Sequence, residues 1–473
     1  MRRSRRRFVG ALAVLLTLPG CFQAGPDYQD PKLRVPGFWR SSREGVVQDD
    51  YWTAAITADQ SAKRTGAELW WEKFDDKTLS LLIRHTRKHH PTAYAAQARI
   101  REARAQQNVL AAAWFPWFGT NDEAQFGESS SANYLAAFEA GWEADLAGKT
   151  SRGVEAATAE WESAIEWQRD SMVVLTADVA MNYIASRTLE ERLSRATEAA
   201  AEFREIHRIL VEREEAGVAP RSDVIESQAQ LQTREARLPK LRQELEVSKI
   251  RLANSCGIYP VALGDLMEKN PGIPKPPHKI LLSAPANMLR NRPDVRREER
   301  KLAAQTARIG LAEAELYPIL SVSGALSWES ESASDLFSQV NRLFGFGPKL
   351  KWRIFEACKI QHRVDEETAQ MNLRLAAYQQ QVLDAVSEIE IAMTRLETES
   401  EYANRQLEAV NAHRESVKMI RESYLAGFVD LRRLLNALID YHDTRDEEAA
   451  AQGRRSAFAA ALFKSIGGGQ MAD

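Results

Sequence analysis

The sequence has few cysteines, no excess of basic charge and no long apolar segment in its main part. Its three cysteines, Cys21, Cys256 and Cys358, are odd in number and widely spaced, so a disulfide framework is not expected. The 63 lysines and arginines face 66 acidic residues, and the net charge of −3 does not point to nucleic acid. After Cys21 no apolar run reaches the roughly 18 residues of a membrane-spanning helix, so none is predicted there.

Patterns typical of enzymes and metal sites are also missing. The only adjacent pair among the eight histidines, His89 and His90, lies in a polar helical stretch without a nearby cysteine, and no CxxC occurs. No Ser-His-Asp arrangement, phosphate-binding glycine loop or pair of carboxylates on one wall stands out. We therefore expect no catalytic residue, no metal and no cofactor, and predict that the protein is not an enzyme.

The N-terminus has the three-part pattern of an export signal. Five arginines lie within Met1–Arg7, an apolar core spans Phe8–Leu18, and Pro19-Gly20 precedes Cys21. A cysteine at this point is what lipoprotein processing acylates, and several acyl chains give stable anchoring. We predict a signal peptide at 1–20 and lipidation of Cys21; ordinary secretion with an incidental cysteine is the alternative, and general secretory or twin-arginine export both fit.

Beyond an extended N-terminal segment, 21–68, most of the chain has a helical pattern. Leucines seven positions apart, from Leu231 to Leu252, predict a seam for antiparallel helix packing. The predicted helices are Leu69–Ala113, Lys149–Ala216, Ser222–Ser255, Asp294–Leu316, Lys359–Ala426 and Leu431–Ser465.

The helical pattern is repeated. Trp142 and Trp352, like Lys149 and Lys359, lie 210 positions apart, which indicates an internal duplication. We predict a first repeat at 69–257 with strands near 116–146, a linker at 258–290, a second repeat at 291–466 with strands near 318–356, and a C-terminal tail at 467–473.

Within each repeat the period changes from helical to two, which predicts β-strands about as long as membrane-spanning ones. The segment after Pro116 alternates poorly. We assign to a lipid-facing surface Tyr134, Phe138, Trp142, Leu320, Val322, Phe344, Phe346, Leu350 and Trp352. We assign to a water-lined lumen Glu139, Glu143, Asp145, Lys349, Lys351 and Arg353. Half-buried strands of a soluble sheet are the alternative, but aromatic residues at the ends of the apolar face favour a membrane.

Four strands cannot close a barrel, and an open sheet edge in lipid leaves backbone groups unpaired. Strands in a membrane would therefore require several copies of the chain, in a number that the strand pattern does not give.

An ordered set of segments resembles the outer-membrane efflux proteins, the TolC-type channels, and more closely their lipoprotein branch. The segments are "GPDYQDP" (25–31), "LWWEKFDDKTLSLLI" (69–83), "GWEADLAGK" (141–149), "NRPDVRREER" (291–300), "ARIGLAEAELYPILSVSG" (307–324), "GPKLKWRIFEACK" (347–359) and "LFKSIGGG" (462–469). The resemblance implies a homotrimer with a twelve-stranded membrane β-barrel, four strands per chain, and a long α-helical barrel in the periplasm. It also implies a periplasmic adaptor and an inner-membrane pump as partners, and passive export of drugs or other small molecules across the outer membrane.

The resemblance further implies that two helix-to-helix turns form the periplasmic tip, where the adaptor would bind and the gate would close. These turns carry Gly217, Val218, Gly427 and Phe428. The lipoprotein branch has an aspartate and, three residues on, an arginine near the second turn. Here those positions are Asn436 and Ile439, with Arg432 one turn earlier.

An acidic replacement for this gate could come from Asp440 or Asp443, although a solvated face is the preferred interpretation. Cys358 stands where the family prefers glycine, and a small buried thiol is expected there. The main alternative function is a lipid-anchored periplasmic coiled-coil adaptor or scaffold that forms no pore.

Overall fold

The computed structural model describes residues 22–31, 33–35, 54–56, 69–126, 132–267, 272–277, 280 and 285–469. The chain divides into two compact units. The first, the strand unit, comprises 1–31, 98–166 and 296–381, and the second, the helical unit, comprises 32–97, 167–295 and 382–473. The signal region and Cys21 lie outside the residues that the structure describes.

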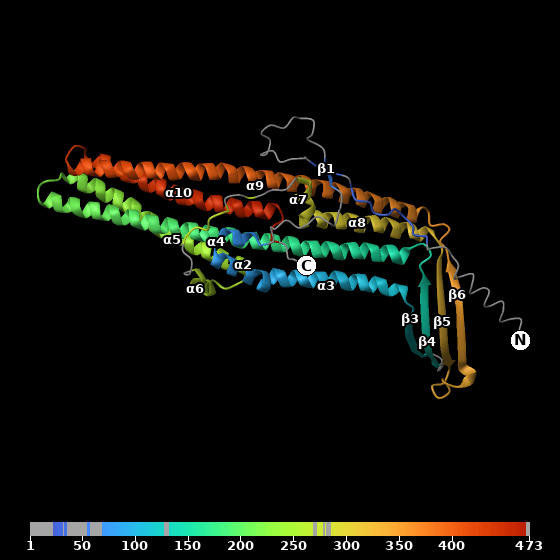
Figure 1. Cartoon of the computed structure of the whole chain (residues 1–473). Coiled ribbons are helices and arrows are strands. Elements are labelled where there is room, and N and C mark those ends of the chain that lie inside the picture. The colour runs from blue at the N-terminus through green and yellow to red at the C-terminus, as the bar shows by residue number, and fades with distance from the viewer. Residues whose placement is uncertain are drawn as a thin grey trace. The chain divides into compact units, whose positions relative to one another are not determined.

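The strand unit contains one antiparallel sheet with the strand order β3-β4-β5-β6 (Figure 1). Its strands are β3 (Trp117–Phe126), β4 (Ala132–Ala144), β5 (Ile319–Ser330) and β6 (Arg342–Lys351). Strand β3 forms although its sequence alternates poorly, because all ten of its residues pair with the well-patterned β4. Strands β3 and β6 are the two edges of the sheet within the chain.

The helices confirm the internal duplication. Helices α4 (Lys149–Glu215) and α9 (Lys359–Leu425) have 67 residues each, and α5 (Arg221–Cys256) and α10 (Leu431–Ser465) have 36 and 35. The two shorter helices α3 (Pro91–Ala111) and α8 (Pro293–Glu313) have 21 each. A 67-residue helix is about 100 Å long at 1.5 Å per residue. The predicted fold class, mainly helical with long antiparallel helices, an internal duplication and four β-strands per chain, is thereby confirmed.

The single helix predicted over Leu69–Ala113 was wrong. The chain instead forms a 3₁₀ turn η3 (Trp70–Phe74), helix α2 (Lys77–His89), helix α3 and a 3₁₀ turn η4 (Ala112–Trp114). Asp76 starts α2 because its carboxylate accepts the backbone N–H of Leu79 at 2.9 Å. His90 ends α2 in an extended conformation, as a residue that precedes proline prefers.

Short elements complete the described chain. Strands β1 (Leu33–Val35) and β2 (Ala54–Ile56) pair antiparallel. A 3₁₀ turn η5 (Pro260–Leu263) leads into α6 (Gly264–Met267), and α7 (Pro285–Asn291) precedes α8. In the second repeat, η6 (Ala314–Leu316) precedes β5 and η7 (Gln339–Asn341) precedes β6. Among the described residues, no helix is both long enough and apolar enough to cross a membrane.

The helical unit has an aromatic core. The Trp70 and Phe463 rings stack with centroids 5.1 Å apart, and Trp70, Trp71 and Tyr183 are at most 1% exposed. The main cluster of the core joins η3, α2, α4, α5, η5, α6 and α10. A second cluster, which includes Phe203, Leu231 and Leu434, packs α4 and α5 against α9 and α10. Leu231, Leu241, Leu245 and Leu252 are buried, in agreement with the predicted seam, and Leu238 is half-buried.

Candidate functional site

The pairing register of the sheet separates apolar from polar side chains. Phe138 lies opposite Leu326, and Leu326 opposite Phe344, so these three side chains share one face. The same face carries every strand residue that was assigned to lipid: Tyr134, Phe138, Trp142, Leu320, Val322, Phe344, Phe346 and Leu350. Trp352, the ninth, directly follows β6. Large apolar side chains on this face are exposed; Phe344 is 77% exposed and Phe346 is 74% exposed.

The opposite face holds most of the charged and small residues, together with Trp117, Leu135 and Leu343. Four of the six residues assigned to the lumen lie there, namely Glu139, Glu143, Lys349 and Lys351. Between them small side chains line the face, and Gly141 is covered by the indole of Trp117, because a Cβ at Gly141 would lie 2.6 Å from Trp117 Nε1.

The other two residues assigned to the lumen lie outside the strands. Asp145 caps helix α4: one carboxylate oxygen accepts the backbone N–H of Thr150 at 3.0 Å and the other that of Ser151 at 2.8 Å. Arg353 follows β6 and forms long ion pairs with Glu315 and Glu356, at 3.9 and 3.6 Å. The alternating pattern had assigned Asp145 and Arg353 to the polar face, but this pattern ends where the strands end.

Two tryptophans make the same hydrogen bond in the two repeats. Trp142 Nε1 donates to the carbonyl of Trp114, and Trp352 Nε1 donates to that of Leu316, each at 3.0 Å. Both acceptors lie two residues before the proline that leads into the first strand of their repeat. Each indole therefore ties the end of one strand to the start of its neighbour.

The two glycine turns at the ends of α4 and α9 have the same geometry. Gly217 and Gly427 have φ of 72° and 78°, a left-handed conformation that glycine adopts without strain. Val218 N donates to the carbonyl of Arg213 at 2.9 Å, and Phe428 N does the same to that of Ser423. This is the Schellman helix ending in both repeats. Val218 and Phe428 are 69% and 85% exposed, so each turn presents an apolar side chain outward.

The residues of α10 that the sequence placed near the gate form an exposed stripe one helical turn apart. Arg432, Asn436 and Asp440 are all exposed, and Arg432 pairs with Glu226 at 3.6 Å. Asp443, considered as a replacement gate residue, instead binds Arg234 at 2.6 Å and Arg237 at 3.0 Å. It therefore belongs to an intrachain cluster that the sequence did not predict.

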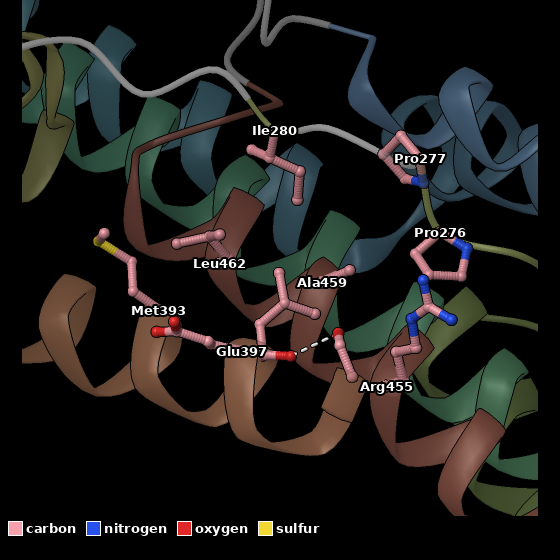
Figure 2. Close-up of a pocket in the computed structure, with 10 residues that line it drawn as sticks. Pro276, Pro277, Ile280, Met393, Glu397, Arg455, Ala459 and Leu462 are labelled. Atoms are coloured by element: carbon pink, nitrogen blue, oxygen red, sulfur yellow. Dashed lines mark hydrogen bonds between the residues drawn. The ribbon is translucent and has the colours of Figure 1, made fainter. Parts of the chain in front are cut away.

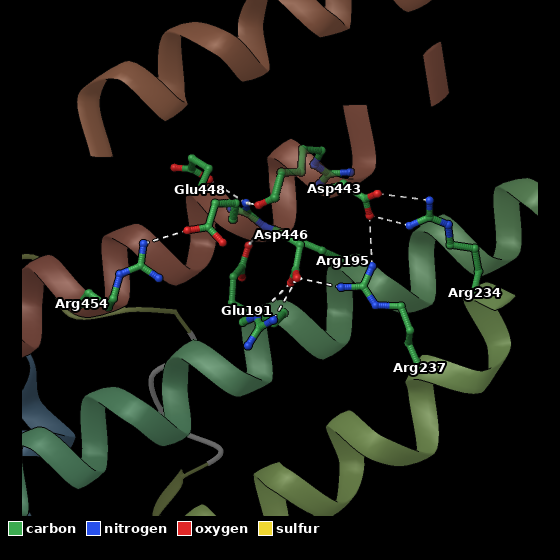
Figure 3. Close-up of polar contacts among 11 residues, drawn as sticks. Glu191, Arg195, Arg234, Arg237, Asp443, Asp446, Glu448 and Arg454 are labelled. Carbon is green, nitrogen blue, oxygen red and sulfur yellow. Dashed lines mark hydrogen bonds and ion pairs between the residues drawn. The ribbon is translucent and has the colours of Figure 1, made fainter. Parts of the chain in front are cut away.

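That cluster joins α10 to α4 and α5 (Figure 3). Asp446 receives a two-pronged contact from Arg192, 2.9 Å to each oxygen, and a third from Arg237 at 3.0 Å. Burial alone would raise the pKa of Asp443, but the hydrogen bonds and charges of Arg234 and Arg237 outweigh it and lower that pKa. The arrangement can lock three helices in one register.

The two described cysteines differ. Cys256 is buried, and burial raises the pKa of its thiol to about 11, so it is an unreactive core residue. The expectation of a buried thiol at Cys358 was wrong, because Cys358 is exposed. Its φ of 61° lies in the left-handed region, which gives a physical reason for glycine at this position.

A cavity of about 350 Å³ opens in the helical unit between a proline-rich segment, α9 and α10 (Figure 2). Met393, Leu462 and Ile280 form its apolar wall, while Glu397 and Arg455 bring opposite charges to it. None of the residues predicted for a functional site lines it.

Comparison with known proteins agrees with this geometry. The family model "Outer membrane efflux protein" matches residues 82–258 and 284–468. The solved outer-membrane channel OprN has a TM-score of 0.81 and 29% identity over 94% of this chain and 99% of that one. Nodulation protein T of Rhizobium leguminosarum bv. viciae is 26% identical, over 93% of this chain and 89% of the relative. The probable outer membrane lipoprotein SilC of Salmonella typhimurium is 22% identical, over 97% and 98%.

A duplicated helical chain with a two-faced strand insertion in each half defines an outer-membrane channel fold. The chain belongs to the outer membrane efflux protein family, and the resemblance inferred from sequence is confirmed. It is a channel subunit of an efflux system in the outer membrane.

Proposed function

We propose that three copies of the chain close a twelve-stranded barrel and that the helices continue this conduit into the periplasm. The observation that carries the proposal is the four-stranded sheet, which combines one apolar face with two unpaired edges, β3 and β6. In lipid each unpaired backbone group costs several kcal/mol, so the edges must pair with other copies. Glu139, Glu143, Lys349 and Lys351 then face the lumen, where charged groups stay hydrated.

The conduit is passive, and it serves an inner-membrane pump that is joined to it through a periplasmic adaptor. Drugs or other small molecules are the proposed cargo. Val218 and Phe428, exposed on rigid glycine turns, would supply the adaptor contact, and the α10 stripe of Arg432, Asn436 and Asp440 would narrow the closed pore. Support for these roles comes from exposure and from the matching turn geometry.

We further propose that Cys21 carries the lipid anchor, as the export pattern predicts and as the name of the relative SilC suggests. Replacing the signal peptide by a conventionally cleaved one together with Cys21→Ala should abolish acylation yet leave part of the protein assembled in the outer membrane. A wholly soluble periplasmic product would contradict the membrane assignment of the strands.

The direct test of the pore is an unboiled gel of outer-membrane fractions followed by planar-bilayer recording of the purified band. We expect a heat-sensitive oligomer of three chains that conducts ions. A monomer that mild washing releases from the membrane would overturn the proposal and would favour the adaptor alternative. Crosslinking in intact cells, followed by purification, would identify the pump and adaptor.

A further inference from the structure

The N-terminal segment 22–31, here called the strap, is held against helices of the strand unit. Ala24 is 1% exposed, and its backbone N–H donates to the carbonyl of Ala147 at 3.0 Å. At its far end the hydroxyl of Tyr28 donates to Glu299 at 3.2 Å, beneath the guanidinium of Arg300. The strap is therefore packed at several points along its length.

One buried side chain makes three hydrogen bonds to the strap. Arg152, in the first turn of α4, donates from Nε to the carbonyl of Ala24 at 2.9 Å. Its Nη2 donates to the carbonyl of Gly25 at 3.1 Å and to the carboxylate of Asp27 at 2.8 Å. The side chain of Arg152 is 2% exposed, and its other carboxylate partner is Glu155 of the same helix. A buried guanidinium is costly without partners, so Arg152 and the strap stabilise each other.

Two glycines allow the strap to approach this closely. Gly25 has a φ of 80°, and a Cβ added to it would lie 2.3 Å from the Cα of Gly310 in α8. A Cβ at Gly310 would in turn lie 2.5 Å from the carbonyl oxygen of Ala24 and 2.7 Å from Nε of Arg152. Backbone meets backbone here, which only glycine permits.

The contacts of Arg152, Gly25 and Gly310, here called the clamp, determine where the first residues of the strap lie. The ring of Phe22 contacts the ring of Tyr317 edge to face, with centroids 5.4 Å apart. Tyr317 is the residue between η6 and the proline that leads into β5. Phe22 directly follows Cys21 in the sequence. The strap thus brings the chain next to Cys21 to the start of β5.

We propose that Arg152 is a positioning residue that fixes the strap and thereby sets where the acylated cysteine is presented, at the start of β5. The proposal rests on the lipid anchor proposed above. Its structural part concerns contacts inside one chain and does not depend on pore formation.

The test replaces Phe22 by the photoreactive p-benzoylphenylalanine in the full-length protein in its membrane. On irradiation we expect an intrachain crosslink to the peptide that contains Tyr317, read by mass spectrometry. Arg152→Met should lower the yield of this crosslink at least fivefold, and Arg152→Lys should restore only part of it, because lysine lacks the planar fork. An unchanged yield in Arg152→Met would overturn the proposal.

Matched controls separate positioning from general loosening. Arg308→Met removes an α4–α8 contact, 2.9 Å to Glu160, without touching the strap, and should leave the crosslink unchanged. An equal loss in this control would count against the clamp. If Arg152→Met does not fold, Gly25→Ala gives the same test from the strap side, with Gly153→Ala as its control, whose Cβ would meet only Leu311 at 3.9 Å. Gly25→Ala with an unchanged crosslink would also overturn the proposal.

A double-mutant cycle tests the link to the lipid. Arg152→Met should reduce the assembled oligomer several-fold in the acylated protein, and should have no further effect in the Cys21→Ala background. An equal reduction in both backgrounds would show that Arg152 acts on folding alone. If the protein with native Arg152 forms the crosslink but conducts no ions, that result counts against the proposed pore and not against the role of Arg152.

Discussion

The sheet and the helical core use large apolar side chains in opposite ways. In the helical unit Trp70, Trp71, Tyr183 and Phe203 are at most 1% exposed, whereas Phe118, Phe344 and Phe346 of the sheet are 74% exposed or more. Water would penalise such a sheet face, and exposed apolar patches of this kind mark interaction sites. The difference supports the proposal that one chain serves two environments, with a core buried by folding and a sheet face that would meet lipid.

The largest effect is expected in the core. Trp70→Ala removes a fully buried ring that stacks on Phe463, and such deletions cost about 3–5 kcal/mol. Thermal unfolding followed by circular dichroism should show the loss. Truncation of the exposed aromatic residue Phe346 serves as the control, since it should not reduce the stability measured by the helical signal. Equal losses in both variants would abolish the contrast between the two regions.

A charge on the sheet tests the two faces against each other. Phe346→Arg places a cation on the apolar face, which costs roughly 2–4 kcal/mol near the middle of a bilayer, and should reduce the membrane-inserted oligomer. Gly345→Arg is the matched control on the opposite face, where an added Cβ meets no atom within 4 Å. The yield of heat-modifiable oligomer measures both, and equal yields would contradict the assignment of the faces.

The charged cluster of the helical unit should respond to pH. Asp443→Asn leaves Arg234, whose side chain is 8% exposed, without its carboxylate partner, and should cost about 1–3 kcal/mol at pH 7. Because folding lowers the pKa of Asp443, its contribution is present above the unfolded pKa, about 3.9, and is lost as the pH falls through the lower folded pKa.

The melting temperature of the native chain should therefore fall more between pH 7 and pH 3 than that of Asp443→Asn. Parallel pH curves would mean that the cluster contributes nothing through this carboxylate. Asp440→Asn is a suitable control, because Asp440 is exposed and its carboxylate forms no ion pair within the part of the chain that the structure describes.

The smallest effect is expected at the duplicated tryptophans. Trp142→Phe removes a hydrogen bond to the carbonyl of Trp114 and should cost about 0.5–1.5 kcal/mol. Trp352→Phe removes its counterpart, and the two losses should be equal and additive because each bond lies within its own repeat. The dissociation temperature of the oligomer is the readout. Unequal losses would show that the repeats have diverged in function as well as in sequence.

Much of the architecture could be read from the chain because it depends on local pattern. Alternation predicted the two faces of β4, β5 and β6, and helical periodicity predicted the long helices almost to the residue. The missed break at His90 was also local, since Asp76 and Pro91 were visible as a cap and a helix start. Strand β3 was harder, because pairing with β4 decides its conformation.

The residues that mattered most for polar contacts were not predictable in this way. Asp443 looked like a solvated or pore-lining carboxylate until the fold brought Arg234 and Arg237, more than 200 positions away in sequence, against it. Arg152 resembled one more charge on a long helix, yet three of its hydrogen bonds go to the strap, which lies outside the first repeat and more than 120 positions earlier in the sequence. Such pairings depend on which helix faces pack, and periodicity does not carry that information.

The sequence by itself determined the duplication, the lengths of the helices and the two faces of the strands, because each of these follows from spacing along one segment. Only the tertiary structure decided which charges are paired and how Arg152 holds the strap. It also decided that Cys358 is exposed, in a backbone conformation that favours glycine. Those features require backbone and side chains that are distant in sequence to meet, and burial of a charge is stable only once its partners are in place.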